Sequence, residues 1–387
     1  MLEFFIAKKY ILERKKQSLS VILGIAIGVI VLIVSIGIDN GLKKERIKTI
    51  LSTTSHILVS NGQKLLKYND LKKQIEAIKG VKVVLPSIEE KGILKYFKDE
   101  KKYIYGVKIE GLELENAKKG MELDKKIIKG NIPLNKIKGV LIGKELTEKL
   151  GTSLEDKISI ISSQNQEMEL EIEGVFQTGF YDYDSNVIIV PLKVVQKLSQ
   201  QENTVDKIKV MLNNPYEASE IANKIMSETK IFSRTWGELN KNLLSALMLE
   251  KTVMIIILSL ISIIAEFTIY ITLNMLVKEK IKDIGIMRAM GFTKKNIMKI
   301  FLIQGIILGI IGIILGIIIA LFFLWYIKNF TLTFITSIYH ISKIPVEISI
   351  KEIGGIIGAN IGIIFIVSIF PAYRVAKMET VEALKYD

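Results

Sequence analysis

The chain lacks cysteine altogether, and its 387 residues include only two histidines, His56 and His340. Without cysteine, disulfides, thiolate zinc sites and cysteine nucleophiles are excluded. The two histidines lie far apart in the sequence, which argues against a histidine-rich metal site and against a Ser-His-Asp triad. The sequence therefore offers few residues for enzymatic chemistry.

A nucleotide-binding P-loop is also missing. The nearest string, Gly139–Lys144, has the wrong spacing and is followed by Glu145 instead of the Ser or Thr of a Walker A motif. Any ATP hydrolysis linked to this chain must therefore come from another polypeptide.

Apolar residues are abundant and gathered into blocks. They make up 49% of the chain, and the mean hydropathy is +0.36. At about 1.5 Å per residue, a helix of about twenty such residues crosses a hydrocarbon core of about 30 Å. Four transmembrane helices are predicted, at 18–38, 253–277, 300–327 and 352–372.

The first apolar run has a rival interpretation as a secretory signal peptide. The run is long for such a segment, and Asp39, Asn40 and Gly41 make a poor cleavage site. The sequence therefore favours a membrane anchor at 18–38.

Between the first two spans, residues 39–252 combine strand-like and helix-like patterns. A polar helix is expected at 39–52, and the remainder is expected to form one α/β domain or two small lobes. Helices are expected near 68–79, 143–150, 191–200 and 215–228. Strands are expected at 56–60, 81–86, 102–111, 157–162, 168–176, 186–191 and 207–212.

The approach to the second span begins with a helix-start signal. Thr235 and Glu238 have the spacing of a capping box, and no Pro or Gly follows from 238 to 284. These features predict one long helix from 235 through the span at 253–277. The alternative is two helices separated by a kink at the membrane interface.

Charge predicts how the chain is oriented. The net charge is +13, which beside apolar blocks indicates an anionic membrane surface rather than nucleic acid. Loop 278–299 carries seven Lys or Arg residues and loop 328–351 carries three. Because Lys and Arg in short loops remain cytoplasmic, the predicted cytoplasmic parts are the amphipathic segment 1–17, loop 278–299 and tail 373–387. The predicted fold class is an α-helical membrane protein with four transmembrane helices plus a mixed α/β extracytoplasmic domain, 39–252, between spans one and two; loop 328–351 is extracytoplasmic too.

Glycines recur four residues apart in the predicted spans, a spacing that lets helix backbones approach closely. They could form a subunit interface, or they could pack the four spans of one chain against each other, which is the favoured reading for any single pair. They are Gly24, Gly28, Gly305, Gly309, Gly312, Gly316, Gly354, Gly358 and Gly362.

Glu266 lies in the middle of the second span, where an ionised carboxylate costs a few kcal/mol or more. It could line a subunit seam or a cleft open to lipid headgroups. Alternatively, the membrane boundary is shifted and Glu266 lies at a shallower depth.

Loop 278–299 combines basic residues with an apolar stripe of Ile281, Ile284, Met287 and Met290 at helical spacing. The stripe could insert into a groove of a cytoplasmic motor or lie on lipid headgroups. Gly291 is expected to end this helix, and the following one is expected to begin after a hydroxyl cap.

Two segments resemble a known family. Lys282–Gly291, KDIGIMRAMG, resembles the signature loop of FtsX-like/MacB-like ABC permeases, in which a G-x-x-R-A-x-G core follows span two. The tail from Pro371, PAYRVAKMETVEALK, resembles the closing P-A-x-R-A-A…P-x-x-A-L-R pattern, with Val375 and Thr380 replacing an Ala and the usual Pro.

The resemblance implies that two permease chains, identical or homologous, pair with two cytoplasmic ABC ATPase subunits. ATP and Mg²⁺ would bind to the ATPases, so this chain would be a non-catalytic subunit without a cofactor. The family's coupling helix corresponds to about 282–291. The implied ATPase-coupling residues are Ile284, Gly285, Met287, Arg288, Ala289, Met290 and Gly291.

The run TWGELNKNLLSALMLEK, beginning at Thr235, looks most like the lipoprotein-releasing subunits of LolC/LolE type. That resemblance implies lipoprotein and membrane lipids as partners, a periplasmic carrier as receiver, and no nucleic acid. LolC-type subunits carry a longer, Pro-containing hook where this chain has only 163–167, which argues against carrier docking and favours a LolE-like or undivided role. The alternatives are MacB-like export of a peptide, drug or toxin and FtsX-like regulation of a cell-wall hydrolase.

Overall fold

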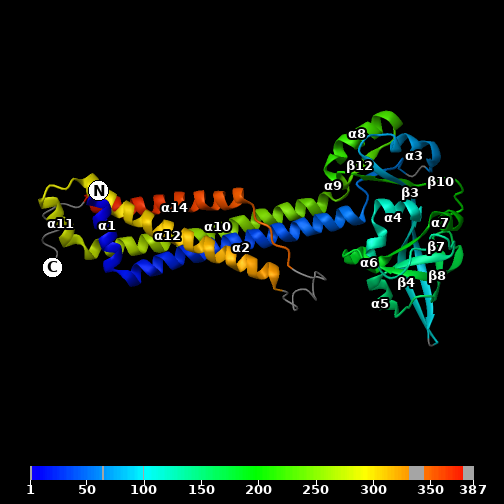
Figure 1. The fold of residues 1–387 in the computed structure, drawn as a ribbon, viewed down its shortest axis with the longest axis horizontal. Coiled ribbons are helices and arrows are strands. Elements are labelled where there is room, and N and C mark those ends of the chain that lie inside the picture. The colour runs from blue at the N-terminus through cyan, green and yellow to red at the C-terminus, as the bar shows by residue number, and fades with distance from the viewer. Residues whose placement is uncertain (1, 63–64, 99, 331–343, 378–387) are drawn as a thin grey trace. The chain divides into compact units, whose positions relative to one another are not determined.

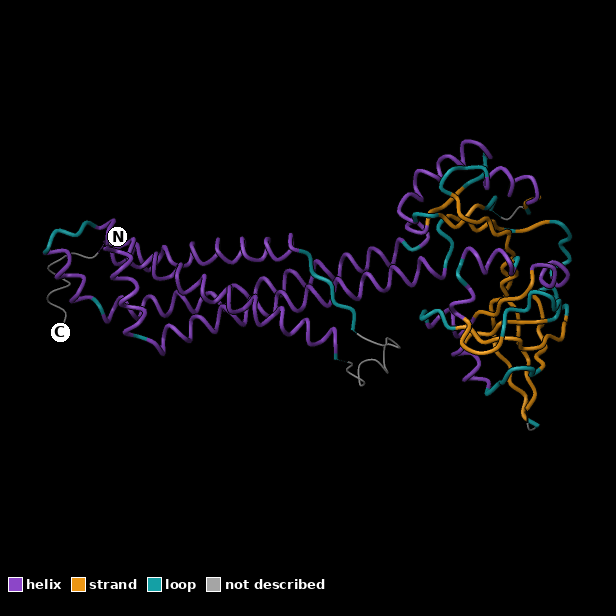
Figure 2. The backbone as a smooth tube through the Cα atoms, in the orientation of Figure 1, coloured by secondary structure: helices purple, strands orange, loops and turns teal. Residues whose placement is uncertain are grey.

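The structure is a computed structural model that describes residues 2–62, 65–98, 100–330 and 344–377. The chain divides into two compact units, a helical unit of residues 1–45 and 246–387 and an α/β unit of residues 46–245. Figure 2 shows the helices of the first unit and the mixture of strands and helices in the second.

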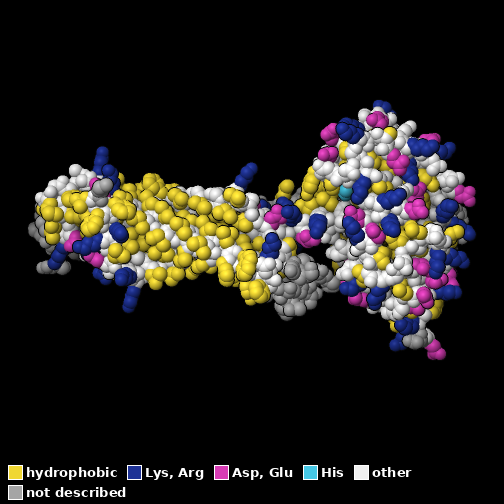
Figure 3. Space-filling model, in the orientation of Figure 1, with side chains coloured by type: hydrophobic (Ala, Val, Ile, Leu, Met, Phe, Trp, Pro, Cys, Tyr) yellow, Lys and Arg dark blue, Asp and Glu magenta, His cyan; other side chains and the backbone are white. Residues whose placement is uncertain are grey.

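Long apolar helices dominate the helical unit. Four of them, α2, α10, α12 and α14, are long and apolar enough to cross a membrane, and each contains one of the four predicted spans. Apolar side chains cover the visible face of this unit, whereas charged side chains are spread over the α/β unit (Figure 3). The described helices are α1 (Leu2–Glu13), α2 (Lys15–Thr53), α10 (Lys241–Glu279), α11 (Ile281–Ala289), α12 (Lys294–Asn329) and α14 (Ile350–Lys377).

The glycines of α12 pack inside the chain. A Cβ added at Gly312 would lie 2.8 Å from Cβ of Ile25, and one at Gly316 would lie 2.8 Å from Cβ of Val29, both on α2. Nearer the beginning of α12, Gly309 lies against Ile364 and Gly305 lies against Ser368, both on α14. At these four glycines, neighbouring helices of the same chain occupy the space that a side chain would need.

The glycines of α14 differ from those of α12. At Gly354, Gly358 and Gly362, no atom lies within 4 Å of an added Cβ. The described helices therefore leave one face of α14 uncovered by this chain. By contrast, Gly24 and Gly28 on α2 lie against α10 of the same chain.

The first helix corrects the expectation of an amphipathic segment at 1–17. Ala7 and Tyr10 are buried on one side of α1, whereas Phe5 and Leu12 are exposed on the opposite side. Apolar residues thus lie on two opposite faces of α1, and only one of these faces packs against α12.

The helix predicted from 235 is interrupted. The capping box is confirmed, since the Thr235 hydroxyl accepts from the Glu238 N–H and the Glu238 carboxylate accepts from the Thr235 N–H. However, α9 (Trp236–Leu239) ends after four residues and α10 begins at Lys241. The Asn240 side chain donates to the Trp236 carbonyl at 2.8 Å, which satisfies the end of α9 locally. The expectation of one uninterrupted helix is therefore wrong, and the break lies well before the apolar span.

The segment before α14 lies against α2. The Glu347 N–H donates to the Gly37 carbonyl at 2.9 Å, and Lys44 forms an ion pair with Glu347 at 2.7 Å. Gly41 allows this approach, because an added Cβ would overlap the Pro345 carbonyl. Residues 331–343 of the predicted loop and 378–387 of the predicted tail lie outside the described residues.

The α/β unit is built on one ten-stranded sheet. All seven predicted strands are present, and β3 is three times as long as its predicted segment because it continues to Lys98. The strands, in sheet order, are β12 (Ser233–Thr235), β1 (Ile57–Val59), β11 (Lys207–Leu212), β3 (Val81–Lys98), β4 (Lys101–Leu112), β9 (Val187–Pro191), β6 (Gly139–Gly143), β8 (Glu167–Phe176) and β5 (Ile127–Gly130), with β7 (Lys157–Ser162) beside β3 and β8, and a separate pair β2 (Leu66–Lys67) and β10 (Thr204–Val205).

Six of these strands close into a ring. The pairings run from β3 to β4, β9, β6, β8, β7 and back to β3. β3 takes part in two sheet regions because its first half pairs with β11 and its second half with β7. Gly92 lies where the second region begins, and a Cβ there would lie 2.7 Å from the Ile161 carbonyl of β7.

Two hydrophobic clusters lie on opposite sides of β3 within this single unit. Val84 belongs to the larger cluster, and its neighbour Leu85 belongs to the smaller one. Figure 1 labels the elements that surround them. The helices are α3 (Tyr68–Glu76), α4 (Leu114–Gly120), α5 (Lys144–Leu150), α6 (Tyr181–Asn186), α7 (Leu192–Leu198) and α8 (Ala218–Thr229), with short 3₁₀ turns η1 (Leu123–Lys126) and η2 (Pro215–Glu217).

Candidate functional site

The apolar stripe of α11 is mostly buried, which corrects the expectation that it is exposed. Ile281, Ile284 and Met287 are only 6%, 2% and 7% exposed. Ile284 and Met287 belong to a cluster that includes residues of α1, the beginning of α12 and Ala372 of α14. The apolar periodicity of α11 therefore marks the side of the helix that packs against α1 and α12. The sequence shows this side but not the helices that cover it.

The outer side of α11 carries a smaller apolar surface. Ile286, Ala289 and Met290 are exposed, with Met290 at 68%. Gly285 is buried beneath them, and Arg288 is half-buried at the boundary. Five of the seven predicted coupling residues thus lie in α11, and Met290 and Gly291 directly follow it; the seven divide between buried and exposed positions.

The turn after α11 has the chemistry expected of it. Gly291 adopts φ +98°, a left-handed conformation in which glycine ends a helix without steric cost. The Thr293 hydroxyl then accepts from the Asn296 N–H at 3.3 Å and caps α12. These contacts fix the direction in which the chain leaves α11.

Ion pairs tie the junction of α10 and α11 to the end of α1. Lys280, which directly precedes α11, lies 3.0 Å from the Glu13 carboxylate of α1 and 3.1 Å from Asp283 of α11. Arg14, which directly follows α1, lies 2.8 Å from Glu279 at the end of α10. The hydrogen bond to Glu13 raises the pKa of Lys280 above its usual value. Polar contacts therefore join α1 to this junction, in addition to the buried cluster.

An open groove of about 380 Å³ lies between α2, α10 and α14 in the helical unit. Its walls are mainly apolar, and they include Ile36, Ile255 and Ala359. Lys251 and Glu352 line the same groove. The groove therefore combines an apolar channel with charged groups.

Polar contacts organise the charged end of this groove. The Asn40 amide donates to both oxygens of Glu352 at 2.9 Å, and Lys251 donates to the Asn40 carbonyl oxygen at 3.0 Å. Lys251 and Glu352 form a loose ion pair at 3.5 Å. The Ser349 N–H donates to Glu352 at 3.0 Å and so caps the beginning of α14. Sequence analysis did not identify this cluster, because its members come from three separated segments.

Glu266 points into the bundle of its own chain. Its side chain is 1% exposed, and neither carboxylate oxygen has a hydrogen-bond partner among the described residues. One turn earlier on α10, the buried Ser262 donates to Asn360 of α14 at 3.3 Å. In this conformation the Glu266 side chain is therefore covered by the rest of the bundle and does not lie on its outer surface.

Two further buried polar residues were not singled out from the sequence. Gln304 and Ser368 are both fully buried, and their side-chain polar atoms also lack partners among the residues described. A glutamine inside the uncharged run at 300–327 was the available signal. Like Glu266, they mark unsatisfied polar positions inside an apolar bundle.

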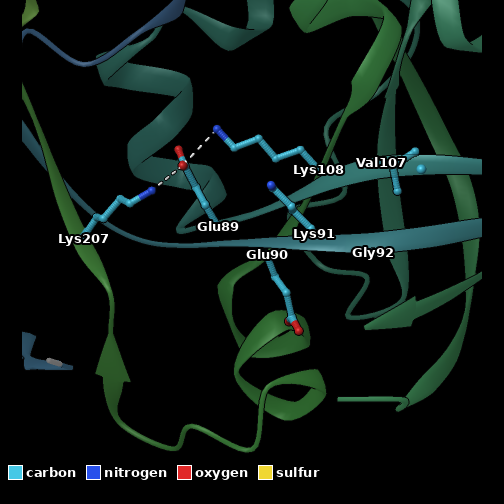
Figure 4. Close-up of a pocket in the computed structure, with 8 residues that line it drawn as sticks. Glu89, Glu90, Lys91, Gly92, Val107, Lys108 and Lys207 are labelled. Carbon is cyan, nitrogen blue, oxygen red and sulfur yellow. Dashed lines mark hydrogen bonds and ion pairs between the residues drawn. The ribbon is translucent and has the colours of Figure 1, made fainter. Parts of the chain in front are cut away.

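The α/β unit contains a surface pocket over β3 and β4, shown in Figure 4. Glu89 lies between Lys207 at 2.5 Å and Lys108 at 2.9 Å, whereas Glu90 points to the other side of β3. Burial acts to raise the pKa of Glu89, but the neighbouring cations, Lys209 first, outweigh burial and hold the pKa far below its usual value. The charged side chains Glu89, Lys108 and Lys207 that line this pocket are therefore already paired with each other.

Behind that pocket lies a buried charge cluster. Lys209 contacts Glu89 at 2.9 Å and also pairs with Glu110, which is fully buried. The Tyr183 hydroxyl donates to Glu110 at 2.6 Å. Among the described residues, no group of three or more His, Asp or Glu is arranged to hold a metal ion.

The β7–β8 connection is a tight hairpin. β7 ends at Ser162 and β8 begins at Glu167. The Ser162 N–H donates to the Gln166 carbonyl at 2.9 Å and closes the turn. The structure therefore has no extended hook at this position.

Two family models match most of the chain between them. The model of the MacB-like periplasmic core domain matches residues 18–227, which is more than half of the chain. The model of the FtsX-like permease C-terminal region matches residues 255–380, from α10 through α14.

Curated relatives align from end to end. The lipoprotein-releasing system transmembrane protein LolC of Xylella fastidiosa is 27% identical, over 96% of this chain and 94% of its own length. LolC of Neisseria meningitidis serogroup B is 25% identical, over 100% and 99%. LolE of Haemophilus influenzae is 24% identical, over 98% of each chain. With four apolar helices, a mixed α/β domain and both family matches, the chain belongs to the family of multi-pass membrane permeases that join a MacB-like periplasmic core domain to an FtsX-like C-terminal region.

Proposed function

We propose that this chain is the permease subunit of an ATP-binding-cassette exporter that releases lipoproteins from the cytoplasmic membrane. The observation that carries the proposal is the end-to-end similarity to LolC and LolE proteins, which includes the α/β unit as well as the four apolar helices. A likeness restricted to the FtsX-like region would support any exporter of the family.

The exposed side of α11 is the proposed contact for a cytoplasmic ATPase, which would bind ATP and Mg²⁺. Ile286, Ala289 and Met290 form a compact apolar knob suited to a groove on a partner. The buried side of α11 would pass a displacement to α1 and α12, because Ile284 and Met287 are packed between them.

Orientation follows from the short loops. We place 278–299 in the cytoplasm because of its seven Lys and Arg residues, and 39–252 outside the cytoplasm. Under this assignment α11 faces the ATPase, and the charged end of the groove lies at the outer surface of the membrane.

A second permease chain, identical or homologous, completes the proposed exporter. The tight turn after Ser162 favours a LolE-like or undivided role, because it offers no extended loop for a periplasmic carrier. The open glycine face of α14, at Gly354, Gly358 and Gly362, is available to a helix of another subunit or to lipid.

Release of lipoproteins from membrane vesicles containing the chain and its ATPase tests the proposal. Depletion of the chain is expected to leave lipoproteins in the cytoplasmic membrane. Normal release after depletion would refute lipoprotein extraction, and a selective loss of peptide or drug export would instead support a MacB-like exporter. A selective loss of cell-wall hydrolase activation would support an FtsX-like regulator.

Coupling is tested with variants of α11. Ile286→Asp, Arg288→Ala and Gly291→Val are expected to reduce release at least about tenfold while the ATPase remains bound and hydrolyses ATP. Met248→Asp is a matched control, because Met248 is equally exposed but lies on α10. Normal release by all three α11 variants would contradict the coupling role.

A further inference from the structure

The groove between α2, α10 and α14 has the length of one membrane leaflet. On α10 it extends from Lys251 to Ser262, and on α14 from Glu352 to Ile363, which are eleven positions in each case. At about 1.5 Å per residue this corresponds to about 16 Å. Half of a hydrocarbon core of about 30 Å is about 15 Å. A lipid chain that begins at the charged end would therefore reach the other end near the bilayer centre.

The mouth of the groove presents both signs of charge side by side. Lys251 and Glu352 have side chains 31% and 29% exposed, and they are held 3.5 Å apart by their contacts with Asn40. A second ion pair joins Lys44 of α2 to Glu347, which lies just before α14. Lys44 follows Asn40 by one helical turn on α2. Cations and anions are balanced here, so the mouth fits a zwitterion better than a purely anionic group.

The walls leave room for an acyl chain. Gly355 lines the groove, and no atom lies within 4 Å of an added Cβ there. The opposite wall is apolar, with Leu32 and Ile255. Toward the deep end, Ser262 donates to Asn360 at 3.3 Å, and the Asn360 amide donates to the Ile356 carbonyl. Because these two polar side chains already have hydrogen-bond partners, a hydrocarbon chain can lie beside them.

We propose that this groove binds one zwitterionic phospholipid with a primary amine, such as phosphatidylethanolamine. The lipid phosphate accepts from Lys251, its ammonium donates to Glu352, and one acyl chain lies along α10 and α14. A choline headgroup has no N–H to donate, and a glycerol headgroup has no cation for Glu352, so both bind less well. The site would hold a resident lipid beside the transport machinery. The lipid site itself does not depend on the transported cargo; only its assignment to the outer leaflet rests on the proposed function.

Photolabelling of the full chain tests this site. The protein is reconstituted in phosphatidylcholine vesicles containing trace phosphatidylethanolamine, phosphatidylglycerol or phosphatidylcholine with a diazirine on one acyl chain. After illumination, labelled peptides are identified by mass spectrometry. Labelling of peptides from 251–262 and 352–363 is expected to be about fivefold higher with the ethanolamine lipid than with either other lipid.

Two adjacent glycines provide matched variants. Gly355→Leu places a side chain in the groove and is expected to reduce labelling to about the background level. Gly354→Leu is the control, because Gly354 is equally open but does not line the groove. Glu352→Gln is expected to bring ethanolamine labelling down to the choline level, and preserved circular dichroism shows that α14 remains folded.

Three results would overturn the proposal. Equal labelling by all three headgroups would remove the headgroup selectivity, and unchanged labelling of Gly355→Leu would remove the groove as the site. Labelling of the groove by a diazirine-bearing lipoprotein, with none by phospholipid, would assign it to cargo instead. Failure of lipoprotein release in vesicles would refute the proposed function without changing any of these lipid measurements.

Discussion

Replacing Lys209 with methionine would isolate the contribution of the buried charge cluster in the α/β unit. Methionine keeps most of the apolar stem and removes the cation that contacts Glu89 and Glu110. Glu89 keeps two other cations, Lys207 and Lys108. Glu110 is fully buried and would keep only the hydrogen bond from Tyr183. The main penalty therefore falls on one stranded carboxylate.

The size of that penalty follows from the lost ion pair. Removing one partner of a buried ion pair typically costs about 3–5 kcal/mol. The loss in free energy of unfolding is therefore expected to be about 4 kcal/mol at pH 7.

Pulse proteolysis of the full chain in detergent, across a urea series, measures this loss in the water-exposed unit. With an m value of about 2 kcal/mol per molar urea, the midpoint should fall by about 2 M at pH 7. Lys207→Met is the control, because Lys207 is partly exposed and Glu89 retains Lys209. Its midpoint should fall by less than about 0.5 M.

A second variant separates a stranded charge from a simple loss of packing. The double variant Lys209→Met, Glu110→Gln should recover at least about half of the lost stability at pH 7, because no unpaired buried carboxylate remains. A Lys209→Met midpoint within about 0.5 M of the parent at pH 7, or no recovery of stability in the double variant, would refute the reasoning.

Four further outcomes are expected. Gly316→Ala should lower the thermal stability of the helical unit in detergent by about 1–3 kcal/mol, since its Cβ would press on α2, whereas Gly358→Ala should leave it unchanged; equal effects would contradict the assigned packing. Thr235→Ala should cost about 1–2 kcal/mol locally, seen as faster amide exchange in the first turn of α9, and unchanged exchange would argue against the cap. Ile284→Ala should destabilise the α1–α11 packing by about 2–5 kcal/mol, measured by protease access to α1; unchanged protection would contradict its burial. The pKa of Glu89 is lowered in the folded state, so the stabilisation by this carboxylate is present above about pH 4.3 and is lost as pH falls. Glu89→Gln should therefore flatten the decline in unfolding free energy between about pH 5 and 3. An unaltered slope would contradict this role of Glu89.

The spans and most strands were predictable because their signals are local. An uncharged run such as 18–38 has few alternatives to a membrane helix, and the alternation in 157–162 matches the burial of β7. β6, at Gly139–Gly143, was missed because all five residues are buried and show no alternation. The break at Asn240 was missed because no Pro or Gly marks it; a side-chain hydrogen bond ends α9 instead.

The sequence predicted which segment, α11, carries the candidate site, but it did not predict which side of that helix is exposed. Periodicity showed that Ile281, Ile284 and Met287 share a face of α11, but only the fold shows that α1 and α12 cover that face. The groove could not be found from sequence, since Lys251 and Glu352 are 101 residues apart and meet only through helix packing. A lone carboxylate inside an apolar run, such as Glu266, was visible at once in the sequence, whereas its burial is seen only in the folded bundle.

The cluster around α11 makes one end of the helical unit a stiff joint. α1 leads directly into α2, α11 follows α10, and α12 and Ala372 of α14 contribute side chains to the same cluster. Closely packed interiors transmit strain rather than absorb it. Torque applied to α11 would consequently reach α1, α12 and α14 directly through this cluster, and would reach α2 and α10 through the chain segments that join them to α1 and α11.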